Sequence, residues 1–446
     1  MTEQMKPSGI EWIGDIPNDW KIQRFKFCGA VLYGCPFNSD FFTNEDTGIP
    51  LIRIRDITSG TISTYYEGHY SSEYMVYSGD VLVGMDGDFN VRIWDNLDAL
   101  LNQRCCKILS SKKINARYLA YYLPHQLYIV NQLTWSTTVK HLLAEDIGNI
   151  PVAYPQLNEQ QAIVRLLDKE CTQIDSIAAD LEKQIAILQQ YKKSLITETV
   201  TKGLDKSVPM KDSGVEWIGE IPEHWEISRV RHLASLCSGA TPSKDVLSYW
   251  EGNIPWVSSQ EVKSDIIEDT SLHISEEAID SCSTQLMPSG TLVMVVRSGI
   301  LQHTIPVALL GVPATINQDI KAFQFNHLML PAYFKYYIQG ENDSLLSVII
   351  KDKTTVESVD NQLLLSLKLM VPPIEEQKAI VAFLNYKCGY IDKILNNKQE
   401  QLNLLMQHKK SLIYEYVTGK KLSLIHILQG YYFCGKGLFQ FQKLSQ

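Results

Sequence analysis

The sequence lacks long apolar runs. Its longest apolar stretches, such as residues 292–296, are far shorter than the roughly 20 residues that a membrane-spanning helix needs. The start of the chain has no signal-peptide pattern. None of the nine cysteines belongs to a Cys-x-x-Cys motif, and the odd number argues against a disulfide framework. We therefore expect a soluble cytoplasmic protein that holds no metal.

Positive charge is also scarce. The chain has 41 Lys and Arg against 50 Asp and Glu, a net charge of −9 at pH 7. Residues 21–157 contain 12 basic and 13 acidic side chains, and residues 226–371 contain 10 and 16. Proteins that bind DNA alone usually present a basic surface to the phosphates. If this chain binds nucleic acid, local groups or a partner must supply much of the attraction.

Signatures of catalysis are equally few. The sequence has no His-Glu-x-x-His, Gly-x-Ser-x-Gly or Asn-Pro-Pro-aromatic motif, and no glycine-rich loop for a methyl donor. Residues 430–437 imitate a phosphate-binding loop, but Gly437 stands where a metal-binding Ser or Thr is required. We expect this chain to be no enzyme and to hold no cofactor.

The sequence does contain an internal repeat: one unit occurs twice. Residues 8–20 return as residues 213–225 after a shift of 205, with two tryptophans in register. Residues 155–175 return as residues 372–392 after a shift of 217. A repeat of this length sets the architecture before any local element is assigned. The twelve extra residues enter as three short insertions, so we expect two domains with one scaffold and divergent loops.

Two motifs stand at the same place in each repeat. The tryptophans are interpreted as anchors that pack the start of each repeat onto its domain; they are Trp12 and Trp20, then Trp217 and Trp225. The pair Glu159-Gln160 is interpreted as capping the start of a long helix. Its equivalent, Glu376-Gln377, precedes Lys378 with the spacing of a nuclease metal site, but the first repeat lacks this lysine. Capping therefore explains both pairs better.

Each repeat begins with a segment rich in short strands. In the first repeat, residues 49–55, 78–84 and 105–109 are apolar or alternating stretches between Gly and Asp, which predicts strands. Residues 115–123 carry apolar side chains at helical spacing, which predicts a helix. The second repeat has the same landmarks. We expect two mixed but strand-rich globular domains.

The second part of each repeat predicts a long helix. Residues 158–201 contain no Pro or Gly, and their copy extends from about residue 375 to 418. At 1.5 Å per residue each helix would be about 65 Å long. Two apolar stripes of matched length most simply bury each other, so we expect an antiparallel coiled coil and an approximate two-fold axis. The predicted stripe in the first helix follows a heptad pattern: Leu167, Ile174, Ile177, Leu181, Leu188, Tyr191 and Leu195.

These patterns divide the chain into five parts. Residues 1–157 and 206–371 are the globular domains, and residues 158–205 and 372–421 are the helices. Residues 422–446 have no counterpart in the first repeat, and their first six residues resemble the translation of a common sequencing-library adapter. We interpret this tail as spurious and the natural C-terminus as missing.

Without a catalytic motif, recognition is the leading hypothesis. Arg, Lys, Gln, Ser and Thr are the side chains that read base edges and hold phosphates. The predicted loops offer these candidate DNA-binding residues: Arg53, Arg55, Arg92, Arg104, Thr137, Thr138 and Lys140 in the first domain, and Ser258, Ser259, Gln260, Arg297, His303, Lys351, Lys353, Thr354 and Thr355 in the second.

Three doubled motifs resemble a known family. They are Glu-Trp-Ile-Gly-x-Ile-Pro-x-x-Trp at the start of each repeat, Pro-x-x-x-Glu-Gln-x-Ala-Ile-Val at the start of each helix and Lys-Lys-Ser-Leu-Ile near its end. In this order, over residues 8 to about 421, they closely resemble the specificity subunits of type I restriction-modification systems.

The resemblance implies an α+β fold with two target recognition domains, each reading one half of a bipartite DNA site, and two helices that fix the spacer. It also implies double-stranded DNA, two methyltransferase subunits and, in restricting systems, restriction subunits as partners. Those partners would hold S-adenosylmethionine, ATP and Mg²⁺.

Two other hypotheses stay open. A non-catalytic scaffold, with the helices as coiled-coil docking sites, would bind its partners whether or not DNA is present. The recognition part of a self-contained restriction-methylation enzyme would need a catalytic segment, which the sequence does not contain. The target bases and the spacer length do not follow from the sequence.

Overall fold

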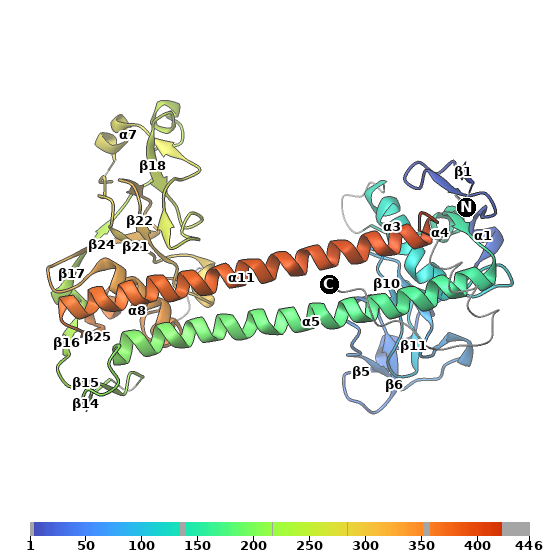
Figure 1. The fold of residues 1–446 in the computed structure, drawn as a ribbon, viewed down its shortest axis with the longest axis horizontal. Coiled ribbons are helices and arrows are strands. Elements are labelled where there is room, and N and C mark those ends of the chain that lie inside the picture. Colours follow the sequence, from blue (N-terminus) through green and yellow to red (C-terminus); the bar gives the residue numbers. More distant parts are fainter. Residues whose placement is uncertain (1–3, 134–139, 216, 283, 351–356, 422–446) are drawn as a thin grey trace, which may run out of the picture. The chain divides into compact units, whose positions relative to one another are not determined.

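The structure, a computed structural model, describes residues 4–133, 140–215, 217–282, 284–350 and 357–421. These residues form two compact units: the first holds the chain up to Asp180 and again from Gln401, and the second is Leu181–Glu400. Each unit combines one globular domain with part of each long helix, α5 (Leu157–Lys202) and α11 (Ile374–Val417) (Figure 1). The predicted α+β fold is confirmed. No helix in the described ranges has both the length and the hydropathy of a membrane span.

The globular part of the first unit contains a four-stranded and a five-stranded sheet. The first has the order β10 (Val91–Ile93), β9 (Val81–Gly84), β12 (Cys105–Leu109), β4 (Ala30–Tyr33), and all its pairs are antiparallel. The second has the order β5 (Phe42–Thr43), β7 (Tyr65–Tyr66), β6 (Ile49–Ile52), β11 (Ala99–Leu101), β8 (Met75–Val76). Two small pairs complete the strands: β1 (Met5–Pro7) with β2 (Asp15–Pro17), and β3 (Lys21–Arg24) with β13 (Pro151–Tyr154).

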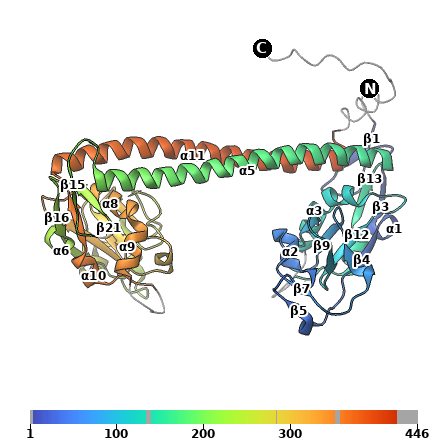
Figure 2. The ribbon, with the colours of Figure 1, turned by 90° about the horizontal axis from the view of Figure 1, so that it is seen from below.

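Four helices and two 3-10 turns join these strands. The longest, α3 (Ala116–Leu133), packs against β9, β10 and β12 (Figure 2). The others are α1 (Phe25–Cys28), α2 (Ile54–Ser59), α4 (Ala144–Asn149), η1 (Ser39–Phe41) and η2 (Ser72–Tyr74).

The second unit repeats this plan. One sheet has the order β17 (Ala234–Ser238), β24 (Ile320–Phe325), β21 (Leu292–Val295), β22 (Val307–Leu310), β19 (Ile266–Ile267), and the other has the order β20 (His273–Ile274), β18 (Ile254–Val257), β23 (Thr315–Ile316). The small pairs are β14 (Met210–Asp212) with β15 (Glu220–Pro222) and β16 (Glu226–Arg229) with β25 (Lys368–Val371). The helices are α6 (Val230–Leu233), α7 (Glu276–Ser281), α8 (Pro331–Gly340), α9 (Asn342–Ile349) and α10 (Asn361–Ser366), with the turns η3 (Leu247–Trp250) and η4 (Gly299–Gln302).

The ends of both long helices are buried in the globular cores. In the first unit, the start of α5 and the end of α11 share one hydrophobic cluster with Trp20 and Tyr118. In the second unit, the end of α5 and the start of α11 share a cluster with Trp225 and Tyr333. Trp20 and Trp225 are fully buried, which confirms them as anchors, whereas Trp217 is 37% exposed.

The Glu-Gln pair at the start of each long helix binds the domain that precedes it and does not serve mainly as a cap. The Trp20 indole N–H donates to Glu159 at 3.1 Å. Gln160, which has no exposed surface, accepts from the Asn115 amide and donates to two backbone carbonyls. Glu376 and Gln377 make the same bonds in the second unit, to Trp225 and to the backbone around Leu330. Buried polar groups need such partners, and this need explains why the pair recurs.

In each unit, a buried tyrosine of the globular domain also binds the last turn of the long helix that ends there. The Tyr118 hydroxyl lies 3.0 Å from the carbonyl oxygen of Val417, and the Tyr333 hydroxyl lies 2.9 Å from that of Val200. The last carbonyls of a helix have no partner within it, so these hydroxyls supply one. Burial raises the pKa of both tyrosines well above the ordinary value, so each hydroxyl remains a donor.

The side of α5 that is shielded from solvent differs from the predicted apolar stripe. Ile177 and Tyr191 are 51% and 55% exposed, so these two assignments were wrong. Cys171, Ala178 and Lys192 lie at the shielded heptad positions instead. The prediction failed because it searched for large apolar residues, whereas this stripe includes small and charged ones.

The lysines on these stripes form ion pairs between the helices. Within the second unit, Lys192 Nζ lies 2.6 Å from Asp392. Within the first unit, Lys409 Nζ lies 2.6 Å from Asp175. A shift of 217 converts one pair into the other. A polar residue in an apolar seam typically specifies helix register.

One predicted strand is shorter than expected. The strand predicted over residues 49–55 ends at Ile52, and α2 begins at Ile54. The Arg53 amide donates to the Asp56 carboxylate at 2.8 Å, which starts the helix in the middle of an alternating pattern.

One predicted helix is longer than expected. The helix predicted over residues 115–123 continues through Pro124 to Leu133 as α3. Leu127, beyond the proline, is buried in the core, and this packing outweighs the lost hydrogen bond.

Replacing Gln160 by Ala should destabilise the chain, because the amide of Asn115 and the carbonyls of Lys113 and Pro155 lose their partner. We expect a loss of about 2–4 kcal/mol in the free energy of unfolding, measured by urea denaturation. The exposed neighbour Gln161 is the matched control, since Gln161→Ala should change it by less than about 0.5 kcal/mol. Equal effects of the two substitutions would contradict the anchoring role of Gln160.

Candidate nucleic-acid interface

Strand direction brings several predicted residues to one edge of the first unit. β6 and β11 run parallel, with Ile52 opposite Leu101, so the residues that follow both strands lie at the same edge. Arg53 follows β6, and Arg104 comes shortly after β11. β12 and β9 are antiparallel with Cys105 opposite Gly84, which places the loop after β9 beside Arg104.

Backbone hydrogen bonds hold three segments together at this edge. The Met85 amide donates to the Arg104 carbonyl at 2.8 Å, and the Gly87 amide donates to the Lys140 carbonyl at 3.0 Å. The Leu142 amide donates back to the Met85 carbonyl at 2.7 Å. We call the positions Arg53, Asp86, Arg104 and Lys140 the loop edge of the first unit.

Asp86 is the electrostatic centre of this loop edge. Its carboxylate lies 2.6 Å from His141 Nδ1 and 4.0 Å from the Arg104 guanidinium. The Arg104 side chain is 58% exposed, whereas that of Asp86 is 19% exposed. Lys140 donates to the side-chain oxygen of Asn131 at 3.1 Å. A mostly buried carboxylate thus lies next to an exposed arginine.

The backbone of the loop edge is strained. Arg104 and Phe89, with φ of 68° and 52°, are the non-glycine residues with left-handed backbone in the described ranges. Such conformations cost about 1–3 kcal/mol each and are concentrated at functional sites. Phe89 is buried below the loop, so packing holds this conformation in place.

The cysteine beside this edge is not a nucleophile. Burial, together with the nearby carboxylates of Asp56 and Asp86, raises the pKa of Cys105 to about 12, although Arg53 acts in the opposite direction. The thiolate is the reactive form, so this thiol is inert at neutral pH. Cys105 therefore acts as a core residue.

The second unit builds the same edge. β18 and β23 run parallel, with Val257 opposite Ile316. The Val296 amide donates to the Asp319 carbonyl at 2.8 Å, the Ser298 amide to the Glu357 carbonyl at 3.1 Å and the Val359 amide to the Val296 carbonyl at 2.8 Å. These are the same three bonds as in the first unit. The loop edge of the second unit is Ser258, Arg297, Asp319 and Glu357.

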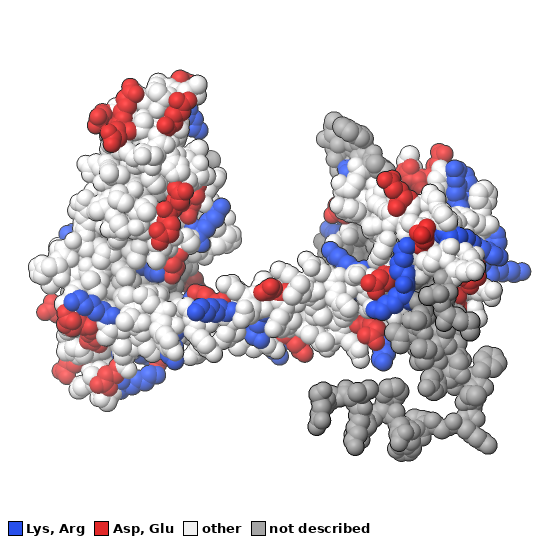
Figure 3. Space-filling model, turned by 45° about the horizontal axis from the view of Figure 1, so that its top comes forward, with Lys and Arg blue, Asp and Glu red and all other residues white. Residues whose placement is uncertain are grey.

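Neither unit is basic over the face that Figure 3 displays. Lys and Arg are interspersed with Asp and Glu, and acidic groups gather on the end of the second unit that carries α7. This distribution agrees with the net charge of −9. Attraction to phosphate must therefore come from single exposed cations or from a partner.

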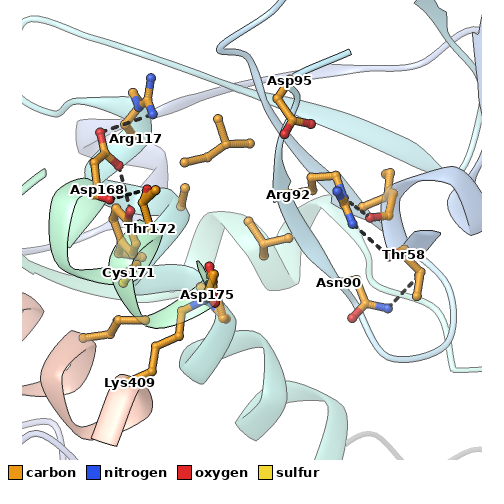
Figure 4. A pocket seen from close by; sticks show the side chains of 17 residues that line it. Thr58, Asn90, Arg92, Asp95, Arg117, Asp168, Cys171, Thr172, Asp175 and Lys409 are labelled. Atoms are coloured by element: carbon orange, nitrogen blue, oxygen red, sulfur yellow. Dashed lines mark hydrogen bonds and ion pairs between the residues drawn. The ribbon is translucent and has the colours of Figure 1, made fainter. Parts of the chain in front are cut away.

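The first unit also contains a cavity of about 640 Å³ between the globular domain and the long helices. Figure 4 shows Thr58, Asn90 and Arg92 on one wall, and Asp168, Asp175 and Lys409 on the other. Four of its charged groups bind one another: Arg117 pairs with Asp168 at 3.2 Å and Lys409 with Asp175. Mutual pairing of this kind is typical of a structural junction.

Arg92 lies in this cavity and not on the loop edge. Its guanidinium donates to the carbonyls of Ile57 and Thr58 at 2.6 and 3.0 Å, at the end of α2. Arg55 is exposed and donates to the Thr64 hydroxyl at 2.9 Å. Both cations thus have partners within the domain.

The remaining predicted residues are dispersed. Ser259 and Gln260 line a separate cavity of about 490 Å³ in the second unit, and His303 is exposed after η4. Several predictions lie outside the described residues: Thr137, Thr138, Lys351, Lys353, Thr354, Thr355 and the tail 422–446. In the described ranges, no group of three or more His, Cys, Asp or Glu side chains could hold a metal ion.

The sequence search missed the acidic members of both edges. It selected cations and hydroxyls, and so passed over Asp86, Asp319 and Glu357, as well as His141. Aligning the two repeats would have found them, because the position of Arg297 corresponds to that of Asp86 after the shift of 211 that relates Gly79 to Gly290.

Comparison with known proteins identifies the family. The family model described as type I restriction modification DNA specificity domain matches residues 34–187 and 222–404. The chain is 29% identical to the specificity subunit of the Escherichia coli type I restriction enzyme EcoBI, over 91% of this chain and 88% of that protein. It is 32% identical to the EcoR124I/EcoR124II specificity subunit of Escherichia coli, over 74% of this chain and 78% of that protein.

A solved structure has the same fold. It concerns complex assembly and conformational transition of the type I restriction-modification system, and one of its chains matches with a TM-score of 0.67 at 16% identity, over 91% of this chain and 99% of that one. The doubled family match covers both repeats, and the relatives align along most of their length. The chain therefore belongs to the type I restriction-modification DNA specificity family and is a specificity subunit of such a system.

Proposed function

We propose that this subunit reads a bipartite DNA site, with residues 1–157 and 206–371 as target recognition domains for one half each. The observation that carries the proposal is the loop edge, which occurs twice on the same backbone bonds with different side chains. Exposed arginines on a fixed backbone are suited to read base edges in a groove. Two such readers with different side chains suit an asymmetric target.

The long helices are proposed to pair as an antiparallel coiled coil with approximate two-fold symmetry and to set the spacer between the half-sites. The supporting contacts are the equivalent ion pairs Lys192–Asp392 and Lys409–Asp175, each within one unit. Half-site spacing follows from the geometry of the protein that connects the readers.

Two methyltransferase subunits are proposed to dock on these helices. Ile187 is 54% exposed and Leu404 is 57% exposed, and a shift of 217 relates them. Exposed apolar groups at equivalent points offer the same contact to two copies of one partner. In this proposal the chain itself is non-catalytic, S-adenosylmethionine is held by the methyltransferase subunits, and restriction subunits would use ATP and Mg²⁺.

Selection from random duplexes tests the recognition role. The complex of this chain with its methyltransferase subunit, at one fixed salt concentration, should enrich two short defined blocks separated by a spacer of constant length and free sequence. A complex that stays intact but enriches no sequence would reject this role and favour the protein-interaction scaffold. The methyltransferase subunit alone is the control.

Lengthening the helices tests the spacer role. Adding seven residues to both α5 and α11, at positions related by the repeat, preserves the heptad period and adds about 10 Å, or roughly 3 base pairs. The selected site should keep both blocks, with a spacer longer by about 3 base pairs. Adding the heptad to α5 alone is the control and should abolish selection, because the stripes no longer match. An unchanged spacer in the double insertion would refute the proposal.

A further inference from the structure

The loop edges of the two units carry opposite charges at equivalent positions. Asp86 in the first unit corresponds to Arg297 in the second, Arg104 to Asp319, and Lys140 to Glu357. The correspondence rests on the three backbone hydrogen bonds, which join the same positions in both units. The backbone is therefore retained while the sign of every one of these charges is reversed.

The backbone bonds that fix each edge do not require these particular charges. The bonds that hold each edge together come from backbone amides and carbonyls, which every residue type supplies. Arg104 is 58% exposed and Arg297 is also exposed, so neither contributes to a core. The backbone at Arg104 is left-handed, and strain of this kind is concentrated at functional sites.

Neighbouring groups orient the acids of each edge. Asp86 is bound by His141 at 2.6 Å. The Asn317 side-chain amide donates to the Asp319 carboxylate at 3.5 Å, and the Gln302 side chain donates to Glu357 at 3.4 Å. In the first unit, Asp86 lies 4.0 Å from the exposed Arg104 guanidinium and limits the directions in which it can point, and bidentate base contacts require a fixed direction.

We propose that these three pairs of positions determine specificity, an inference that rests on the proposed function. Arg104 reads a guanine in the first half-site and Arg297 reads a guanine in the second, each through the O6 and N7 acceptors of the major groove. The arginine follows β11 in the first unit and β21 in the second, so it projects from a different position on the same framework. The two half-sites therefore carry their guanine at different places, and the target is asymmetric.

The test measures methylation rates of the full complex on its selected duplex and on every single-base variant of that duplex. Arg297→Gln should reduce discrimination at one base pair of one half-site by between about 5-fold and 150-fold and leave the other half-site unchanged. Arg104→Gln should do the same in the other half-site. Arg231→Gln, an exposed arginine of α6 in the second unit, is the matched control and should change neither.

A charge-preserving variant separates base reading from phosphate binding. Arg297→Lys keeps the positive charge but loses the bidentate fork, so discrimination at the same base pair should still fall. If Arg297→Lys keeps full discrimination while Arg297→Gln weakens methylation of all duplexes equally and flattens its salt dependence, the residue binds phosphate and the inference is overturned.

Other results would also overturn the inference. No change in either arginine variant, with the complex intact by size exclusion, would do so, as would effects of both variants on the same half-site. If Arg297→Gln prevents assembly, Arg104→Gln and Arg297→Lys still decide the outcome. A wild-type complex that shows no preference among duplexes would instead refute the proposed function, before any variant is measured.

Discussion

Buried polar side chains that tie the ends of two long helices to the globular domains are the constraint on which the rest of the structure depends. Gln160 and Gln377 bind three backbone groups each. The glutamate that precedes each glutamine accepts a hydrogen bond from Trp20 or Trp225. Each bond in such a buried network is costly to leave unmade, so the start of each helix has one orientation on its domain. The Trp, Glu and Gln side chains that make these bonds are identical in the two repeats.

The residues that anchor the helix ends are distinct from those of the loop edges, which leaves the loop edges free to change. Backbone bonds fix the backbone of each loop edge, so its exposed side chains can differ between the two units. In the proposed function, the residues that anchor each domain differ from those that read DNA, so the target can change while the anchors are kept. The reversed charges at Asp86 and Arg297 are an example.

The long helices could be predicted from the sequence to within about two residues, because more than 40 residues without proline and a heptad pattern leave few alternatives. The residues of α5 that face α11 could not be predicted in the same way, because Cys171 and Lys192 are among them only through packing with α11. Alternation predicted a strand through Arg53, and a local carboxylate, Asp56, started a helix there instead. Local patterns do not contain the contacts that decide such cases.

The candidate site was predictable only in part, for a similar reason. Arg104, Lys140 and Arg297 were selected by residue type, and strand pairing places them on the loop edges. Arg92 was selected by the same criterion, yet its guanidinium binds the end of α2. Residue type does not distinguish a cation that faces solvent from one that serves its own domain, because that depends on which carbonyls lie within reach.

The central claim is that one chain supplies two different readers for a single split site. Methylome sequencing of cells that co-express this chain with its methyltransferase subunit tests it most directly, with each chain alone as a control. The account predicts a methylated motif of two unlike blocks with a fixed spacer, present only when both chains are expressed. Methylation at a single contiguous block, or a motif that appears without this chain, would contradict it.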